Sequence, residues 1–353
     1  MLRLYLSFTD STCSIDSSWK IPSSKRREER ISSMIHVSPS PHYPGKSRTS
    51  SMMMRDVLIA LIPCVLMAVY VFRSHAVFQI AVCVASCLAS EAIFSLMRGK
   101  KIPLRDGSAA VTGVILALSL PWSAPWYVGV IGSFVAIGIG KIIYGGLGQN
   151  VFNPAMVGRA FVMINFPVAL GASAYVSSGT GIHIITQATP LTAAKLTAQV
   201  SGLWPLFLGT CNGSLGEVSA LACLIGGLYL CFRRTASWEI PAGIFLSVII
   251  LGGVANMVSI HKQITVLHHL FSGALFFGAF FIATDPVTSP LTPLGKWIFG
   301  IGLGFFIMMI RLFSGYPEGV MFAVLLMNGC VPIINRYTIP VPVGGPVPEK
   351  KVS

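Results

Sequence analysis

The chain has 353 residues, of which 54% are hydrophobic and only 10% are charged, and its mean hydropathy is +0.74. Soluble domains carry about 25% charged residues, so this composition excludes a soluble globular protein and indicates an integral membrane protein. The 25 Lys and Arg exceed the 12 Asp and Glu, which gives a formal net charge of +13. These cations cluster at the ends of apolar runs, as membrane topology requires, so we expect no nucleic-acid partner.

Ten apolar segments are long enough to cross or enter a bilayer, which takes about 20 residues for a full helix and fewer for a broken one. We therefore predict an all-α membrane protein with about ten transmembrane helices, some of them short or broken. The segments cover approximately residues 57–73, 76–97, 108–121, 126–144, 152–168, 216–232, 239–257, 268–284, 296–313 and 319–335.

Charges in the connecting loops predict the orientation. The N-terminal arm, the loop after Arg98 and the turn at Arg233 are basic, whereas the loop 121–126 has no charge. The positive-inside rule then puts both termini in the cytoplasm and the long loop that begins at residue 169 on the outer face.

The spans divide into two related halves. Residues 153–165 (NPAMVGRAFVMIN) align without gaps on residues 316–328 (YPEGVMFAVLLMN) with four identities, and the segments before them correspond in order. Each half has five spans, an odd number, so the second half must be inverted relative to the first. Inverted repeats with short, proline-interrupted helices are typical of membrane proteins that bind cofactors, ions or substrates near the midplane.

The predicted domains follow from these halves. Residues 1–33 lack the apolar core of a signal peptide, and we expect Met34 to be the functional start. The divisions are a polar cytoplasmic extension (1–54), a first five-helix repeat (55–168), a polar loop with a re-entrant segment (169–215), a second five-helix repeat (216–338) and a cytoplasmic tail (339–353).

Few ionisable residues lie within or beside the spans, where each costs about 2.5 to 3.5 kcal/mol at the bilayer centre. Asp285 is the preferred candidate for an ion pathway because prolines interrupt its helix and free backbone carbonyls nearby. Glu318 and Asp106 are the next candidates, and Glu91 and Glu217 lie in similar places. The alternative for each is an interfacial position of no functional consequence.

Two glycine-containing stretches are candidate cofactor sites. GTCNGSLGE (209–217) contains Gly213, Ser214 and Glu217 just before a helix, where backbone amides favour an anionic group. Arg159 follows the stretch GGLGQNVFNPAMVG and is a candidate phosphate or flavin contact. A plain turn and a snorkelling cation are the alternatives. The eight cysteines form no C-x-x-C pair, and we predict no metal site.

Thr189 lies in the polar loop, in the sequence Gln187-Ala-Thr-Pro-Leu191. Its hydroxyl is suited to esterification by a phosphate, and equally to capping a short helix begun by Pro190.

Taken together, these motifs resemble the D subunit of the Rnf ion-translocating electron-transport complex, which is homologous to the B subunit of the sodium-pumping NADH:quinone oxidoreductase. The resemblance covers about residues 35–345 and is carried by VSPSPHYPGKSRTSSMMMRDVLIALIP, DGSAAVTGVILALSLP, GQNVFNPAMVGRAF, QATPLTAAK, GSLGEVSALA, ATDPVTSPLTPLG and RLFSGYPEGVMFAVLLMN.

The resemblance implies FMN held covalently at Thr189 through a phosphoester installed by a flavin transferase, and a second, noncovalent flavin between the helices. It also implies electron flow between ferredoxin and NAD, coupled to sodium or proton movement in a bacterial inner membrane. The implied partners are membrane lipid and other subunits, including iron–sulfur subunits and a second FMN-carrying subunit. His183 and Gln187 depart from the family's flavin-transferase motif, which usually has Asp and a small residue there. The alternatives are a B-type quinone-reductase subunit, a secondary transporter and a scaffold without flavin.

Overall fold

The structure of the chain is a computed structural model that describes residues 49–99, 106–170, 202–208, 213–217, 219–258, 265–314 and 319–340. The described part is helical and contains no strand, which confirms the prediction of an all-α protein. Within these ranges, five helices are long and apolar enough to cross a membrane: α2 (Ser50–Phe72), α3 (Ser74–Met97), α11 (Glu239–Met257), α14 (Pro293–Phe313) and α15 (Val320–Thr338).

The remaining apolar segments are short or broken, as the sequence predicted. Two of them contain a π-helix, a wider turn that often marks functional sites. The first half has α4 (Ser108–Ser119), α5 (Trp126–Ile137) continued by the π-helix η2 (Gly138–Ile142), α6 (Pro154–Asn165) and α7 (Pro167–Leu170). The second has α10 (Ala220–Phe232) and a segment made of α12 (Val266–Phe271), α13 (Leu275–Phe277) and the π-helix η4 (Gly278–Ile282). In the sequence, the short helix α9 (Leu203–Leu208) comes between the two halves.

Side-chain caps explain where several helices begin. Thr49 accepts a hydrogen bond from the Met52 amide, so α2 starts seven residues before the apolar run that predicted it. Asn153 caps α6 and is followed by Pro154 at the first helical position, where a missing N–H costs nothing. Thr292 caps α14 in the same way.

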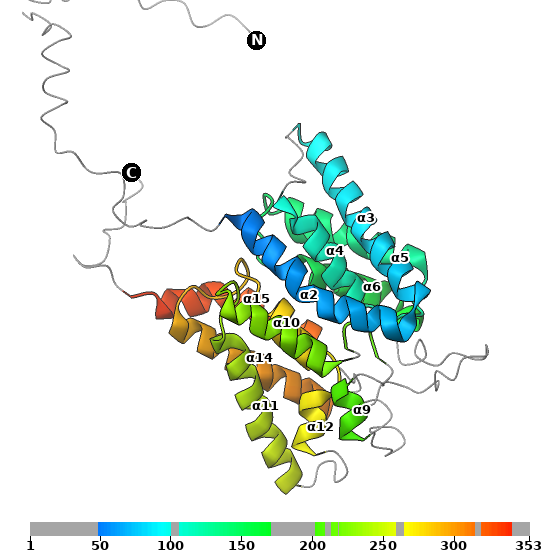
Figure 1. Cartoon of the computed structure of the whole chain (residues 1–353). Helices are drawn as coiled ribbons and strands as arrows, with labels where there is room; N and C mark the ends of the chain where they lie inside the picture. Colours follow the sequence, from blue (N-terminus) through cyan, green and yellow to red (C-terminus); the bar gives the residue numbers. More distant parts are fainter. Residues whose placement is uncertain are drawn as a thin grey trace, which may run out of the picture. The chain divides into compact units, whose positions relative to one another are not determined.

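The two halves lie side by side and meet along α2 and α10 (Figure 1). In each half the second segment packs along the fourth, α3 on α5 and α11 on α14, and the fourth packs along the fifth. Gly226 of α10 approaches α2 so closely that a Cβ there would lie 2.1 Å from the Ala60 carbonyl oxygen. Small residues permit such backbone contact between membrane helices, where burial of apolar surface gives no preference for association.

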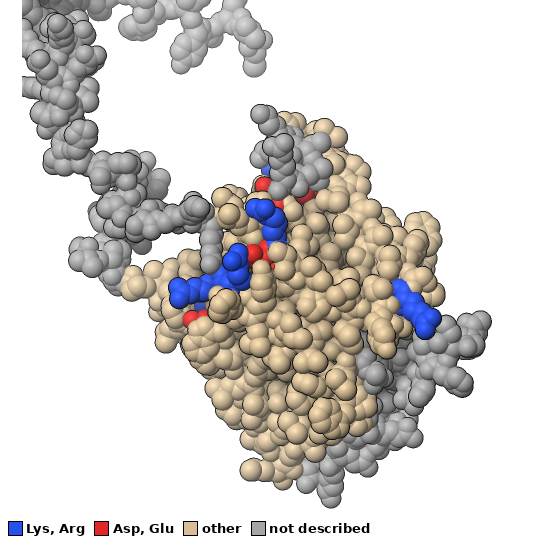
Figure 2. Space-filling view, in the orientation of Figure 1, with Lys and Arg blue, Asp and Glu red and all other residues tan. Residues whose placement is uncertain are grey.

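The outer surface of the helices is apolar, as a lipid-facing surface must be. Leu66, Phe78 and Leu96 are each more than half exposed. Figure 2 shows broad uncharged surface, with charged side chains gathered mostly near the start of α2. This distribution confirms a multi-pass membrane protein whose exposed charges lie mostly at helix ends.

Candidate functional site

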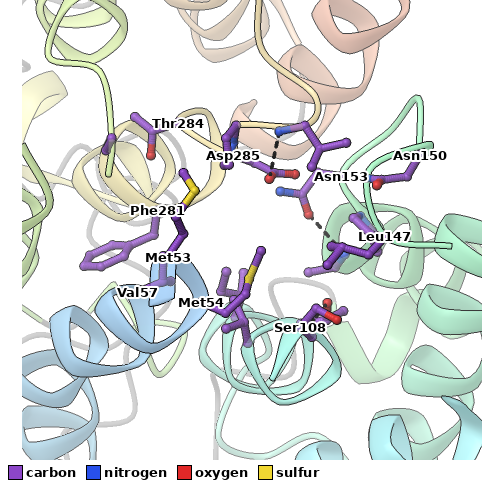
Figure 3. Close-up of a pocket in the computed structure, with 18 of the residues that line it drawn as sticks. Met53, Met54, Val57, Ser108, Leu147, Asn150, Asn153, Phe281, Thr284 and Asp285 are labelled. Carbon is purple, nitrogen blue, oxygen red and sulfur yellow. Dashed lines mark hydrogen bonds between the residues drawn. The ribbon is translucent and has the colours of Figure 1, made fainter. Parts of the chain in front are cut away.

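A pocket lies between the two halves, near the end of the bundle at which α2, α4 and α6 begin (Figure 3). The empty space between its lining atoms is about 770 Å³ and includes open solvent at the mouth. Apolar side chains of α2 and η4 form one wall, and polar side chains from four segments lie at its edges. The apolar wall includes Met53, Met54, Val57 and Phe281, and the polar residues include Ser108, Lys141, Asn150, Asn153, Thr284 and Asp285.

Asn153 ties the two halves together at the pocket. Its side-chain oxygen caps α6, and its amide nitrogen donates to the Ile282 carbonyl at the end of η4 (3.3 Å). Asn328 of α15 adds a second link, because its side-chain amide can donate to the Thr288 carbonyl (3.2 Å) and accept from the Asn153 N–H (3.0 Å). These bonds satisfy backbone groups that the broken helices leave without partners.

Asp285 follows η4 and faces the pocket from the loop that leads to α14 (Figure 3). Its carboxylate accepts hydrogen bonds from the Val287 N–H (3.3 Å) and the Thr288 hydroxyl (3.2 Å). Removal from water raises the pKa of the Asp285 carboxyl above its usual value, and the two hydrogen bonds lower that pKa by less. The preferred ion-pathway residue therefore lines the pocket, and its role stays a prediction.

A buried ion pair lies behind the pocket wall. Lys141 of η2 donates to the carboxylate of Glu91 on α3 and to the hydroxyl of Ser108 at the start of α4 (2.6 Å for the second bond). The side chains of Lys141 and Glu91 are 4% and 1% exposed, so water screens this pair little. Lys141 and Ser108 line the pocket, whereas Glu91 does not.

A second polar cluster contains the residues predicted to bind a cofactor. Arg159 lies 3.9 Å from Glu217, and the Ser214 amide donates to the Glu217 carboxylate (3.4 Å). The segment 213–217 is held against the end of α4, where the Leu215 amide donates to the Leu120 carbonyl (3.2 Å). The 12 residues of α4 rise about 18 Å, so this cluster and the pocket lie at opposite ends of that helix.

The structure thus brings Arg159, Ser214 and Glu217 together, with Gly213 adjoining them in the same segment. Asp106 lies just before α4 and is not among the residues that line the pocket. Glu318 and Thr189 lie outside the described residues. Their predicted roles, and those of the second cluster, stay predictions.

Sequence reasoning missed Lys141, Asn150 and Asn153 as pocket residues. A signal for Lys141 was present, because it lies within an apolar span and Glu91 supplies an opposite charge within another. The two asparagines had no comparable signal, since their place follows from how α6 packs on η2 and from the hydrogen bond of Asn153 to the end of η4.

The cations of the described residues lie mostly at the pocket end of the helices: Arg55, Arg98, Arg233, Arg234, Lys296 and Arg336. Hydrogen bonds between neighbouring helix ends support this grouping. Arg233 after α10 donates to Asp56 of α2 (3.2 Å), and Lys296 of α14 donates to Ser237 before α11 (2.6 Å). Arg73, between α2 and α3, lies at the opposite end.

A helical membrane protein whose two halves enclose a pocket with polar edges belongs to the class that binds cofactors, ions or substrates between broken helices. Residues 36–344 match the model of the NQR2, RnfD, RnfE family. The chain therefore belongs to this family.

Curated relatives are similar over most of their length. The D subunit of the Na(+)-translocating ferredoxin:NAD(+) oxidoreductase complex of Acetobacterium woodii is 43% identical, and the match covers 86% of this chain and 93% of the relative. The D subunit of the proton-translocating ferredoxin:NAD(+) oxidoreductase complex of Clostridium ljungdahlii is 39% identical, with 87% and 96% covered. The D subunit of the ion-translocating oxidoreductase complex of Stutzerimonas stutzeri is 42% identical, with 81% and 90% covered.

Proposed function

We propose that the chain is the membrane subunit of a complex that transfers electrons between ferredoxin and NAD and couples this transfer to sodium or proton movement. The observation that carries the proposal is the 43% identity to a relative of that kind over 93% of the relative's length. The pocket and the buried charges support it, because ionisable groups inside membrane helices mark pathways for ions, electrons or substrates. The chain acts together with other subunits, including iron–sulfur and FMN-carrying ones.

Within this function, Thr189 carries FMN through a phosphoester formed by a flavin transferase. A covalent bond keeps a small redox carrier from diffusing away, and the isoalloxazine supplies electron-transfer chemistry that no side chain provides. The placement of cations at one end of the bundle supports an orientation with that end in the cytoplasm and the Thr189 loop on the outer face of the inner membrane.

The covalent flavin is tested on the protein co-produced with a flavin transferase. A denaturing gel of wild-type protein shows a fluorescent band, and mass spectrometry finds an FMN-sized addition on the Thr189 peptide. Thr189→Val removes both signals while membrane insertion and thermal unfolding stay unchanged. Wild-type protein without the mass addition would contradict covalent attachment.

The pocket is the proposed place of the second, noncovalent flavin. Its apolar wall suits the flat isoalloxazine, and its polar edge suits the donors and acceptors of the pyrimidine ring. Lys141 has three N–H donors, two of which are used by Glu91 and Ser108, and the Asp285 carboxylate adds an acceptor at the rim. When bound, the flavin supplies one- and two-electron transfer, while these residues orient the ring and exclude water.

Asp285 is the proposed ion-pathway residue at the pocket. Asp285→Asn keeps the shape of the side chain and removes its charge, so we expect assembly of the complex to continue and ion movement per electron to fall at least tenfold. Ion uptake and ferredoxin-dependent NAD reduction are measured in the same proteoliposomes. Asp106→Asn tests the next candidate of the ion pathway, which does not line the pocket. Normal coupling in the Asp285→Asn complex would rule out this residue.

A further inference from the structure

Lys141 joins three separate segments at one buried point. It belongs to η2, its carboxylate partner Glu91 belongs to α3, and its hydroxyl partner Ser108 begins α4. Both charged side chains are almost completely buried. This is a concentrated electrostatic element inside an otherwise apolar half of the protein.

Stability alone does not account for such a pair. Removing two charges from water costs about as much as their attraction returns, so a well-packed apolar pair of similar size is often equally stable. Glycines already allow the same segments to pack closely: a Cβ on Gly138 would lie 2.8 Å from the Phe94 ring of α3. Small residues therefore also support the packing of η2 on α3, which does not rest on the ion pair alone.

The pair is oriented with respect to the pocket. Lys141 and Ser108 line it, whereas Glu91, which pairs with Lys141, does not. A ligand in the pocket is consequently nearer to the positive member of the pair than to the negative one. The local backbone contributes to this arrangement, because the π-helix places the Ile143 N–H on the Gly138 carbonyl (3.0 Å), which widens the turn that carries Lys141.

We propose that Lys141 is the residue that tunes the redox equilibrium of a flavin in this pocket, and that Glu91 is its positioning residue. The proposal rests on the proposed noncovalent flavin. Addition of two electrons and one proton to the neutral isoalloxazine leaves one negative charge on its pyrimidine ring. The Lys141 ammonium group stabilises that charge, while Glu91 holds the ammonium in place and weakens its field at the ligand.

This arrangement predicts opposite effects for the two members of the pair. Glu91→Gln retains a hydrogen-bond partner for Lys141 and removes the opposing charge. The affinity for reduced flavin should therefore rise relative to the affinity for oxidised flavin. Lys141→Met removes the stabilising charge, so the affinity for reduced flavin should fall relative to the affinity for oxidised flavin. A pair that only supported the fold would give losses of the same sign in both variants.

The experiment uses the full chain produced without a flavin transferase, so that only noncovalent flavin is present. Bound flavin is quantified after denaturation, and its midpoint potential is measured by titration with dithionite and mediator dyes. The decisive comparison is Glu91→Gln against the double variant Glu91→Gln/Lys141→Met. These two proteins have the same neutral residue at position 91 and differ only at position 141, where methionine lacks the ammonium charge and its N–H donors.

We expect the ratio of affinities for reduced over oxidised flavin to be at least tenfold higher in Glu91→Gln than in the double variant. Tenfold corresponds to about 30 mV for a two-electron couple. Lys141→Arg restores the charge and should lie within threefold of the wild type. Lys296→Met, which removes a lysine outside the pocket lining, should leave the potential unchanged.

Three results would overturn the proposal. Equal potentials in Glu91→Gln and the double variant would reject the role of Lys141 and leave the flavin site intact. Complete loss of flavin from both variants, with unchanged thermal unfolding, would mean that the pair is needed to bind flavin and does not set its redox equilibrium. Absence of noncovalent flavin from the wild-type chain would reject the second flavin itself. The test of covalent FMN at Thr189 does not depend on that result.

Discussion

Each half of the protein buries one cation in its fourth segment, and the two cations have different partners. Lys141 of the first half pairs with the Glu91 carboxylate. Arg311 of the second half is fully buried and donates to the carbonyls of His269 and Ser272, the latter at 2.9 Å. The sequence repeat keeps a cation in this part of the fold, and the two halves use it differently.

The difference follows from the third segment of each half. In the first half this segment is the continuous helix α4, which leaves no orphan carbonyls beside Lys141. In the second half it is interrupted after Phe271, and the carbonyls of His269 and Ser272 lie at the break. A helix end inside a membrane needs donors for its last carbonyls, and Arg311 supplies two. Lys141 therefore faces the pocket, whereas Arg311 donates hydrogen bonds to carbonyls at the end of a helix.

The two π-helices also do not occupy equivalent positions in the two halves. η2 is in the fourth segment of the first half, whereas η4 is in the third segment of the second half. Both contribute side chains to the pocket, Lys141 from η2 and Phe281 from η4. The pocket is thus built from non-equivalent parts of two related halves, which gives it one polar edge and one apolar wall.

The largest effect is expected at Arg311. Arg311→Met leaves two buried carbonyls without charged donors, and we expect a loss of about 4 kcal/mol in the free energy of unfolding. Helix content followed by circular dichroism in detergent during denaturation measures this change. Arg336→Met is the matched control, because Arg336 is exposed near the end of α15, and it should change stability by less than about 0.5 kcal/mol. Equal stability of the two variants would mean that the break does not depend on Arg311.

The Lys141–Glu91 pair should behave differently from Arg311. Lys141→Met alone leaves a buried carboxylate unpaired, and we expect it to cost about 3 kcal/mol. The double variant Glu91→Gln/Lys141→Met removes both charges and should recover all but about 1 kcal/mol. A double-mutant cycle of unfolding free energies measures the coupling. If the losses from Glu91→Gln and Lys141→Met simply add in the double variant, the two charges are not coupled. Each would then be required for stability in its own right, as Arg311 is.

The membrane class and the helical segments were predictable, because apolar runs and their lengths follow directly from the bilayer. Asp285 was singled out for its prolines, and it lies at the pocket. Two features of the helices were not predictable from apolar composition. The polar cap at Thr49 extends α2 beyond its apolar run, and the break at Ser272 interrupts a run that the sequence continues.

The polar interior was less predictable because it depends on contacts between distant residues. Glu91 and Lys141 are 50 positions apart and meet only when α3 packs along α5 and η2. Asn153 and Ile282 are 129 positions apart and belong to different halves. A single sequence reveals that such charges and amides lie in apolar spans, but not which of them will pair.

The smallest predicted effect concerns the contact between the halves. A Cβ on Gly226 of α10 would lie 2.1 Å from the Ala60 carbonyl oxygen of α2, and a backbone atom cannot move aside as a flexible side chain can. Gly226→Ala therefore forces α10 and α2 apart, and we expect it to lower the free energy of unfolding by about 1–3 kcal/mol.

Gly253 provides the matched control, because it is also within a helix, α11, and a Cβ there would meet nothing within 4 Å. Gly253→Ala should raise stability by about 0.5 kcal/mol, since alanine loses less backbone entropy than glycine in a helix. The pocket takes side chains from both halves, so separation of α2 from α10 should also weaken retention of any noncovalent flavin in Gly226→Ala and leave it unchanged in Gly253→Ala. If both variants unfold alike, close backbone contact is not what holds the halves together, and the hydrogen bonds of Asn153 and Asn328 across the pocket become the main connection between them.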